Sequence, residues 1–256
     1  MDMDTESHQP AGTGTALASH FFSVVSARPG QERAAAHQRL DDDAYGDHQW
    51  LWRLFPAAPG TPRDFLFRRD DEPGRPPRYH VVSARPPIDP GGAWEVRTRD
   101  YMPRLAAGDR LAFELRASPT VRHDREGGKS RRHDVVMDAK KRLLAERGLP
   151  DWASWVGDDR PPLYALVQSS CADWLTRRAE RAGFELDEDA CVASAYQQFS
   201  RSGGRRSAGA AAALQFSSVD LAGWLTVRDP DRFVQALVQG LGPAKAFGCG
   251  LLLVRR

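Results

Sequence analysis

Strand-like apolar segments and amphipathic helices alternate twice along this chain, and this double pattern is the strongest constraint on its fold. In the first half, an apolar β-branched segment precedes a helical pattern, and further strand patterns follow. This order is that of the split βαβ, or ferredoxin-like, unit. The sequence predicts strands over 16–26, 64–69, 78–84 and 110–118, and a helix over 44–55.

The second half repeats the plan in architecture rather than in residue identity. Residues 190–200 and 211–227 are predicted to pair as a hairpin, and Asp229 should cap a helix with Pro230 in its first turn. We therefore expect an α+β chain of two tandem ferredoxin-like (βαββαβ) domains. The remaining predicted elements are strands over 132–138 and 248–256 and helices over 151–155, 172–183 and 229–241.

Two stretches interrupt these patterns and set the expected domain limits. Residues 1–15 are polar and small, with Gly and Pro among them, and are expected to form a disordered tail. Residues 119–131 are poor in apolar side chains and rich in Gly and Arg, as a linker would be. The sequence therefore predicts an N-terminal domain over 16–118 and a C-terminal domain over 132–256.

Charge and cysteine content narrow the classes of partner and compartment. The 256 residues carry a net charge of only +2, so binding to nucleic acid would depend on where the arginines lie. Cys171, Cys191 and Cys249 form no CxxC pair, which argues against a disulfide scaffold or a zinc ribbon. The histidines show no metal-ligand spacing, so no metal or other cofactor is expected.

The compartment follows from what the chain lacks. It contains no apolar run of about 18 residues, the length that a membrane-spanning helix needs. Its N-terminus is acidic where a signal peptide would be basic. We expect a cytoplasmic protein that does not bind membranes.

Tyr45 and His48 are the candidate catalytic pair. Their spacing places both side chains on one face of the predicted helix, with about 5–6 Å between the Cβ atoms. An imidazole with a pKa near about 6.5 can take or give a proton at neutral pH. The same face carries Leu51 and Phe55, so a buried core histidine is the alternative interpretation, and packing at the helix start is the alternative for Tyr45.

Basic residues and glycines gather in three connections where they could contact phosphate groups. Each cluster could equally be a solvated loop, and the glycines could simply end a helix or allow close packing of strands. The candidate nucleic-acid-binding residues are Arg201, Arg205 and Arg206 in the predicted hairpin loop, Lys129, Arg131 and Arg132 at the linker, and Lys245, Gly248 and Gly250 near the C-terminus.

Two segments resemble signature motifs of the CasE family of CRISPR endoribonucleases. In YGDHQWLWRLFP, residues 45–56, a histidine follows the tyrosine by three residues, and the aromatic-aliphatic helix ends in Phe-Pro. The stretch GLGPAKAFGCGLLLVRR, residues 240–256, resembles the glycine-rich loop and last strand of that family. Segments 113–133 and 216–233 match in order and spacing, so the resemblance extends over nearly the whole chain.

This resemblance implies two tandem ferredoxin-like domains that bind the stem-loop of CRISPR repeat RNA. It implies one cut at the 3′ side of the stem, retention of the product, and assembly with the other subunits of Cascade. His48 would be the general base or acid, and Tyr45 would orient the phosphate or the nucleophile. No metal would be needed, because the 2′-hydroxyl of RNA is the nucleophile and the products are a 2′,3′-cyclic phosphate and a 5′-hydroxyl.

Three other functions fit part of the sequence. A non-catalytic RNA-binding subunit would share the fold and the glycine-rich loop without using Tyr45 and His48. A purely structural subunit would use neither. A metal-dependent nuclease would be stopped by a chelator. Since the fold by itself warrants no function, the Tyr45–His48 pair is the discriminating feature.

Overall fold

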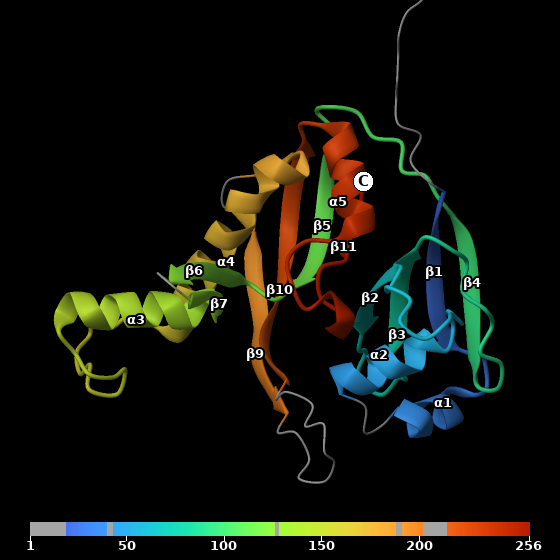
Figure 1. Ribbon diagram of the computed structural model, residues 1–256, viewed down its shortest axis with the longest axis horizontal. Helices are drawn as coiled ribbons and strands as arrows, with labels where there is room; N and C mark the ends of the chain where they lie inside the picture. Colours follow the sequence, from blue (N-terminus) through green and yellow to red (C-terminus); the bar gives the residue numbers. More distant parts are fainter. Residues whose placement is uncertain (1–18, 40–42, 126–127, 188–190, 202–213) are drawn as a thin grey trace, which may run out of the picture.

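The structure is a computed structural model that describes residues 19–39, 43–125, 128–187, 191–201 and 214–256. Two larger sheets lie side by side, one formed by the first hundred or so residues and one by the rest (Figure 1). The predicted tail, residues 1–15, lies outside the described part of the chain. Within the described part, no helix is long and apolar enough to cross a bilayer.

The first sheet follows the strand order of a ferredoxin-like unit. Its strands run antiparallel in the order β2-β3-β1-β4. The connection from β3 to β4 contains no helix, so the unit lacks the second helix of the pattern. The elements are β1 (His20–Ala27), α1 (Glu32–Arg39), α2 (Ala44–Trp52), β2 (Phe65–Asp70), β3 (Arg78–Ser83) and β4 (Trp94–Tyr101).

Two elements of this unit were not predicted from the sequence. β4 is an edge strand whose charged side chains are mostly exposed, so it lacks the apolar alternation that marks a half-buried strand. α1 is short and polar, and only Ala35 and Arg39 in it are buried. Neither segment carries the apolar periodicity on which the prediction of secondary structure depends.

The second sheet has the same order, β11-β5-β10-β8, and β9 pairs with β10 beyond this path. The expectation of two tandem ferredoxin-like units is thus confirmed at the level of strand order. The elements are β5 (Arg110–Ala117), β6 (Thr120–Arg125), β7 (Gly128–Asp134), α3 (Val135–Arg147), α4 (Leu163–Ala179), the 3-10 helix η1 (Glu180–Ala182), β8 (Phe184–Leu186), β9 (Val192–Arg201), β10 (Leu214–Val227), α5 (Pro230–Gln239), the 3-10 helix η2 (Lys245–Phe247) and β11 (Leu252–Arg255).

The predicted strand 110–118 belongs to the second sheet, not to the first. As β5 it pairs with β10 and β11, so the chain passes from one sheet to the other between β4 and β5. The expected limits of 16–118 and 132–256 therefore divide the second sheet. Residues 119–131 do not form a plain linker, because most of them build the β6–β7 hairpin. The sheet to which β5 belongs and the structure of residues 119–131 both depend on strand pairing. A local sequence pattern does not show which strands pair.

Two further predictions in the second half are wrong. The predicted strand 132–138 is divided, because Asp134 accepts a hydrogen bond from the Met137 backbone N–H at 2.9 Å and starts α3 there. Residues 151–155 form turns and bends rather than a helix. By contrast, the hairpin of β9 and β10 and the Asp229 cap of α5 are confirmed.

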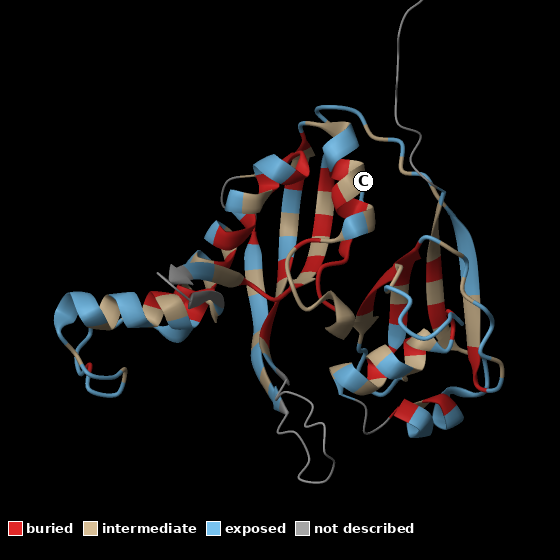
Figure 2. Cartoon of the chain, in the orientation of Figure 1, coloured by how far each residue is buried: buried red, intermediate tan, exposed pale blue. Residues whose placement is uncertain are grey.

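Each unit has its own apolar core, on the face of the sheet that the helices cover (Figure 2). Trp174, Phe233 and Leu115 are among the fully buried side chains of the second core, and Phe55 and Trp94 of the first. A smaller cluster of Leu66, Val82 and Leu251 joins the first sheet to the segment that precedes β11.

The glycine-rich segment between α5 and β11 closes on itself through backbone contacts. The Leu241 N–H donates to the Gly250 carbonyl at 2.8 Å, and the Gly250 N–H donates to the Arg116 carbonyl at 2.7 Å. Gly250 has φ +93°, and a Cβ added there would lie 2.8 Å from the Leu241 carbonyl oxygen. The amide of Gly250 is therefore used within the chain, which favours the packing interpretation for this glycine.

We predict that Gly250→Ala lowers the free energy of unfolding by about 3 kcal/mol, from overpacking together with the left-handed backbone. Gly108→Ala is the matched control, because Gly108 has φ +92° and no atom within 4 Å of an added Cβ. It should cost only about 1 kcal/mol. Urea unfolding measures both losses, and equal losses would contradict the close packing at Gly250.

Candidate functional site

The helix α2 is fixed at its start by Asp43. The Asp43 carboxylate accepts hydrogen bonds from the backbone N–H groups of Tyr45 and Gly46 at 3.1 and 2.9 Å. The predicted helix is confirmed, although regular helix ends at Trp52 and turns continue to Phe55. One turn of helix thus separates the cap from His48.

His48 is half-buried and its imidazole is held by aromatic neighbours. Its Nε2 accepts a hydrogen bond from the Trp52 indole N–H at 3.2 Å. Because an indole only donates, Nε2 carries the lone pair, and the proton of the neutral ring sits on Nδ1. Nδ1 is buried and has no hydrogen-bond partner within the described residues. The ring of Phe247 lies 6.1 Å away, centroid to centroid.

The environment keeps this imidazole neutral. Burial lowers the pKa of His48 below its usual value near 6.5, and the positive charge of Arg63 lowers that pKa further. A neutral imidazole is the form that can accept a proton, and here its lone pair on Nε2 is held by the Trp52 indole. A buried N–H without an acceptor is costly, typically about 1–3 kcal/mol, and so marks a place that a ligand could satisfy.

Tyr45 is at the first turn of α2, and its side chain is 39% exposed. Its hydroxyl accepts a hydrogen bond from the Gln49 amide at 3.1 Å. This exposure is larger than that of a core tyrosine. Its part in orienting a phosphate or a nucleophile stays a prediction.

Arg63 lies near both His48 and Lys245, and the sequence analysis missed it. Its charge lowers the pKa of both neighbours. Its guanidinium stands 5.8 Å from the Phe65 ring, and its Nη1 is buried without a hydrogen-bond partner in the described residues. Lys245 donates from Nζ to the Gln239 carbonyl at 2.6 Å. Arg63 lies in an irregular segment, where neither periodicity nor a motif could have identified it.

The helix that carries His48 is anchored by its neighbour, Asp47. The Asp47 carboxylate is almost fully buried and accepts hydrogen bonds from Arg39 at 2.5 Å and from the Tyr79 hydroxyl at 2.6 Å. Arg69 donates to both carboxylate oxygens at 3.2 Å. Burial and the Asp47 charge raise the pKa of Tyr79, so the phenol stays protonated and donates.

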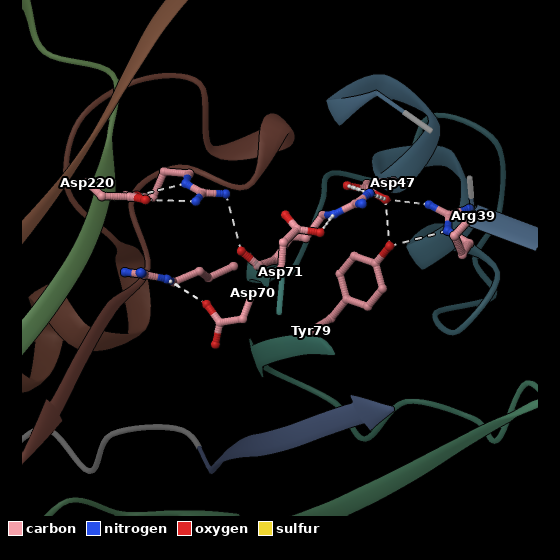
Figure 3. Close-up of polar contacts among 9 residues, drawn as sticks. Arg39, Asp47, Asp70, Asp71, Tyr79 and Asp220 are labelled. Carbon is pink, nitrogen blue, oxygen red and sulfur yellow. Dashed lines mark hydrogen bonds and ion pairs between the residues drawn. The ribbon is translucent and has the colours of Figure 1, made fainter. Parts of the chain in front are cut away.

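The same chain of contacts reaches the second sheet (Figure 3). Arg116 of β5 pairs with Asp220 of β10 through two hydrogen bonds of 2.8 Å. It also donates to the Arg69 carbonyl at 3.2 Å. Because Arg69 binds Asp47, one line of polar contacts connects the helix that carries His48 with the central strands of the second sheet.

The structure brings only some of the predicted binding residues near His48. Lys245 and Gly248 lie in the segment beside Phe247, and Gly248 faces the Phe67 ring. Arg132 is exposed on β7. Lys129, Arg131 and Arg201 lie in strands, but their side chains are outside the described residues, as are Arg205 and Arg206 entirely.

We predict that Arg63→Gln raises the pKa of His48 toward its ordinary value, because a nearby positive charge disfavours the imidazolium. The shift should be partial, since burial is the larger cause. An NMR titration of the imidazole C–H signals measures it. Arg53→Gln, at the end of the same helix, removes an exposed charge and should leave this pKa unchanged. An unchanged or lowered pKa in Arg63→Gln would contradict the placement of Arg63.

We predict that Asp47→Asn destabilises the protein by roughly 3 kcal/mol, because it removes the buried negative charge that pairs with the Arg39 guanidinium. Asp71→Asn removes another carboxylate partner of Arg69, but one that is 58% exposed. It should cost about 1 kcal/mol or less. Urea unfolding of both variants tests the ranking, and a reversed order would show that Asp47 is not the anchor.

Comparisons with known proteins give matches over most of the chain. A family model described as "CRISPR associated protein" matches residues 21–256. The CRISPR system Cascade subunit CasE of Escherichia coli is 30% identical over 212 residues, covering 82% of this chain and 90% of that protein. The CRISPR-associated endoribonuclease Cse3 of Thermus thermophilus is 29% identical over 210 residues, covering 82% of this chain and 81% of that protein.

The fold is similar as well. A solved structure of Thermus thermophilus Cse3, bound to an RNA that represents a pre-cleavage complex, superposes with a TM-score of 0.63. It is 25% identical and covers 93% of this chain and 100% of that one. The family model spans the segments that hold both sheets, α2 and the glycine-rich loop. The chain therefore belongs to the CRISPR-associated protein family that includes CasE and Cse3.

Proposed function

We propose that this chain is a metal-independent endoribonuclease that cuts CRISPR repeat stem-loop RNA once, at the 3′ side of the stem. It then stays bound to the product as a subunit of a Cascade-type complex. The observation that carries the proposal is His48: a neutral, half-buried imidazole with an unsatisfied Nδ1, close to the positive charge of Arg63, in a chain of the CasE and Cse3 family.

The reaction uses the nucleophile that RNA itself contains. The 2′-hydroxyl loses its proton and its oxygen bonds to the adjacent phosphorus, while the bond from phosphorus to the 5′-oxygen of the next nucleotide breaks. That oxygen takes up a proton. The products are a 2′,3′-cyclic phosphate and a 5′-hydroxyl, and no water or metal enters this step.

We assign one of these proton transfers to His48. In its neutral form it can accept the proton of the 2′-hydroxyl once RNA displaces the Trp52 indole from Nε2. If it instead enters the step as the imidazolium, it protonates the leaving oxygen. Tyr45, at the exposed start of the same helix, would orient the phosphate or the nucleophile.

Two cations can balance the charge that builds on phosphorus oxygens in the transition state. Arg63 and Lys245 lie close enough to each other for the charge of Arg63 to lower the pKa of Lys245. Partly buried cations act more strongly on a developing negative charge than exposed ones do. The proposed RNA contacts of Arg132, Lys129, Arg131, Arg201, Arg205 and Arg206 would hold the stem, and their phosphate contacts would weaken as salt rises.

The three cysteines are free and buried in the structure. Free thiols suit a reducing compartment, so we propose that the protein works in the cytoplasm, where guide RNA is made.

A non-catalytic RNA-binding subunit is the competing function, since the Trp52 and Phe247 contacts of His48 would also suit a core histidine. The two functions differ in what His48→Ala does. Loss of cutting with hairpin binding retained supports catalysis. Loss of both together supports the core histidine.

We predict that wild-type protein cuts its CRISPR repeat hairpin once in the presence of EDTA. His48→Ala should lower the single-turnover rate by about 100- to 10,000-fold, the usual contribution of general acid-base catalysis. His37→Ala, an exposed histidine of α1, is the matched control and should cut normally. A hairpin with a 2′-deoxy nucleotide at the cut site should bind but stay intact.

Two results would count against this function. Cutting that EDTA abolishes would point to a metal-dependent nuclease. Tight hairpin binding without any cut by wild-type protein would point to the non-catalytic subunit.

A further inference from the structure

A cavity of about 260 Å³ lies where the two sheets meet, and Phe247, whose ring lies 6.1 Å from that of His48, is one of the residues that line it. Its lining comes from segments distant in sequence: the start of α2, the end of β2, Arg116 of β5, the paired strands β9 and β10, and the η2 segment. Neither Tyr45 nor His48 lines it, so it is distinct from the proposed cutting site.

One wall of the cavity is a column of three phenylalanine rings. Phe199 and Phe216 stack at 4.9 Å with an angle of 17° between their planes. Phe216 and Phe247 stack at 5.2 Å and 18°. All three rings are half-buried, so each keeps some surface toward solvent. Partly exposed aromatic rings beside an RNA-cutting site are the usual platforms on which unpaired bases stack.

Another part of the lining is charged. Asp43, Asp47 and Asp71 line the cavity, together with Arg69 and Arg116. These guanidinium groups are engaged by carboxylates: Arg69 by Asp47 and Asp71, and Arg116 by Asp220. This part of the lining therefore offers a phosphate no uncompensated positive charge, whereas a base with an exocyclic amino group can donate to a carboxylate oxygen.

β9 is irregular where it lines the cavity. Its pairing with β10 shifts register opposite Ser218 and Asp220, and Ala195 in this stretch has φ +49°. A left-handed backbone at a residue other than glycine is strained and often lies at a functional site. The small side chain of Ala195 and the exposed Gln197 both line the cavity, and the Gln197 amide has no hydrogen-bond partner among the described residues.

We propose that this cavity binds the base of one unpaired nucleotide next to the scissile phosphate, and that it prefers a base with an exocyclic amino group (adenine, cytosine or guanine) to uracil. The proposal rests on the proposed function, since it assumes RNA at His48. Phe247 then separates the two halves of one nucleotide: the phosphate lies on the side of His48, Arg63 and Lys245, and the base lies on the side of the phenylalanine column.

Base placement can be measured without cutting. The non-cutting His48→Ala protein is mixed with repeat hairpins that carry 2-aminopurine at each single position flanking the cut. We expect stacking to quench the fluorescence several-fold at one position. Phe199→Ala introduced into the same protein should remove that quenching. Trp224→Ala is the matched control, because it removes a half-exposed aromatic ring from the same sheet without touching the cavity.

The cutting protein gives an independent readout. An abasic nucleotide at the quenched position should weaken wild-type binding by about ten-fold, within the range of one base–aromatic stack. It should weaken Phe199→Ala binding no further, since the partner ring is already gone. A hairpin with uracil at that position should bind less tightly than one with cytosine. Gln197→Ala changes an exposed residue and spares the rings, and it should reduce this difference in affinity.

The outcomes separate the two proposals. Suppose that the hairpin binds and is cut, but that 2-aminopurine fluorescence is quenched at no flanking position. Suppose instead that the affinity losses from the abasic nucleotide and from Phe199→Ala are additive at every position. Either result would contradict the base pocket and leave the nuclease proposal intact. If wild-type protein binds no repeat hairpin at all, both proposals fall. If it binds and quenches without cutting, the pocket stands and the nuclease falls.

Discussion

The buried carboxylate of Asp47 is the contact on which the geometry of the site depends. It holds Arg39 from α1, Arg69 from β2 and Tyr79 from β3, so it ties three elements of the first unit to α2. A charge at this depth is stable only when it is paired and fully hydrogen-bonded. That requirement sets the rotation of α2 about its axis, and the next residue, His48, faces the junction of the two sheets as a consequence.

Polar, apolar and backbone contacts together fix how the two sheets meet. A line of polar contacts runs from Asp47 through Arg69 and Arg116 to Asp220, and an apolar cluster with Leu66 and Leu251 lies beside it. Gly250 completes the closure, because its backbone contacts leave no space for a side chain. The two units of one fold thus act together, since the candidate site exists only where they touch.

Charge is divided across this junction. The positive charge of Arg63 acts on both His48 and Lys245, and acidic residues are among those that line the cavity beside Phe247. The positive charge of Arg63 attracts an incoming phosphate. The same charge disfavours the protonated form of His48 and so keeps its imidazole neutral. A nucleic-acid site in a chain of net charge +2 is therefore understandable: what matters is the local field, not the total charge.

The sequence by itself determined most of the strand–helix plan, the start of α2 and the β9–β10 hairpin, because each depends on neighbours within a turn or a hairpin. Only the tertiary structure decided that β5 belongs to the second sheet and that Arg63, Phe247 and the phenylalanine column gather near His48. These residues are far apart along the chain. Strand pairing and the packing of one sheet against the other bring them together, and no local pattern of residues records those long-range contacts.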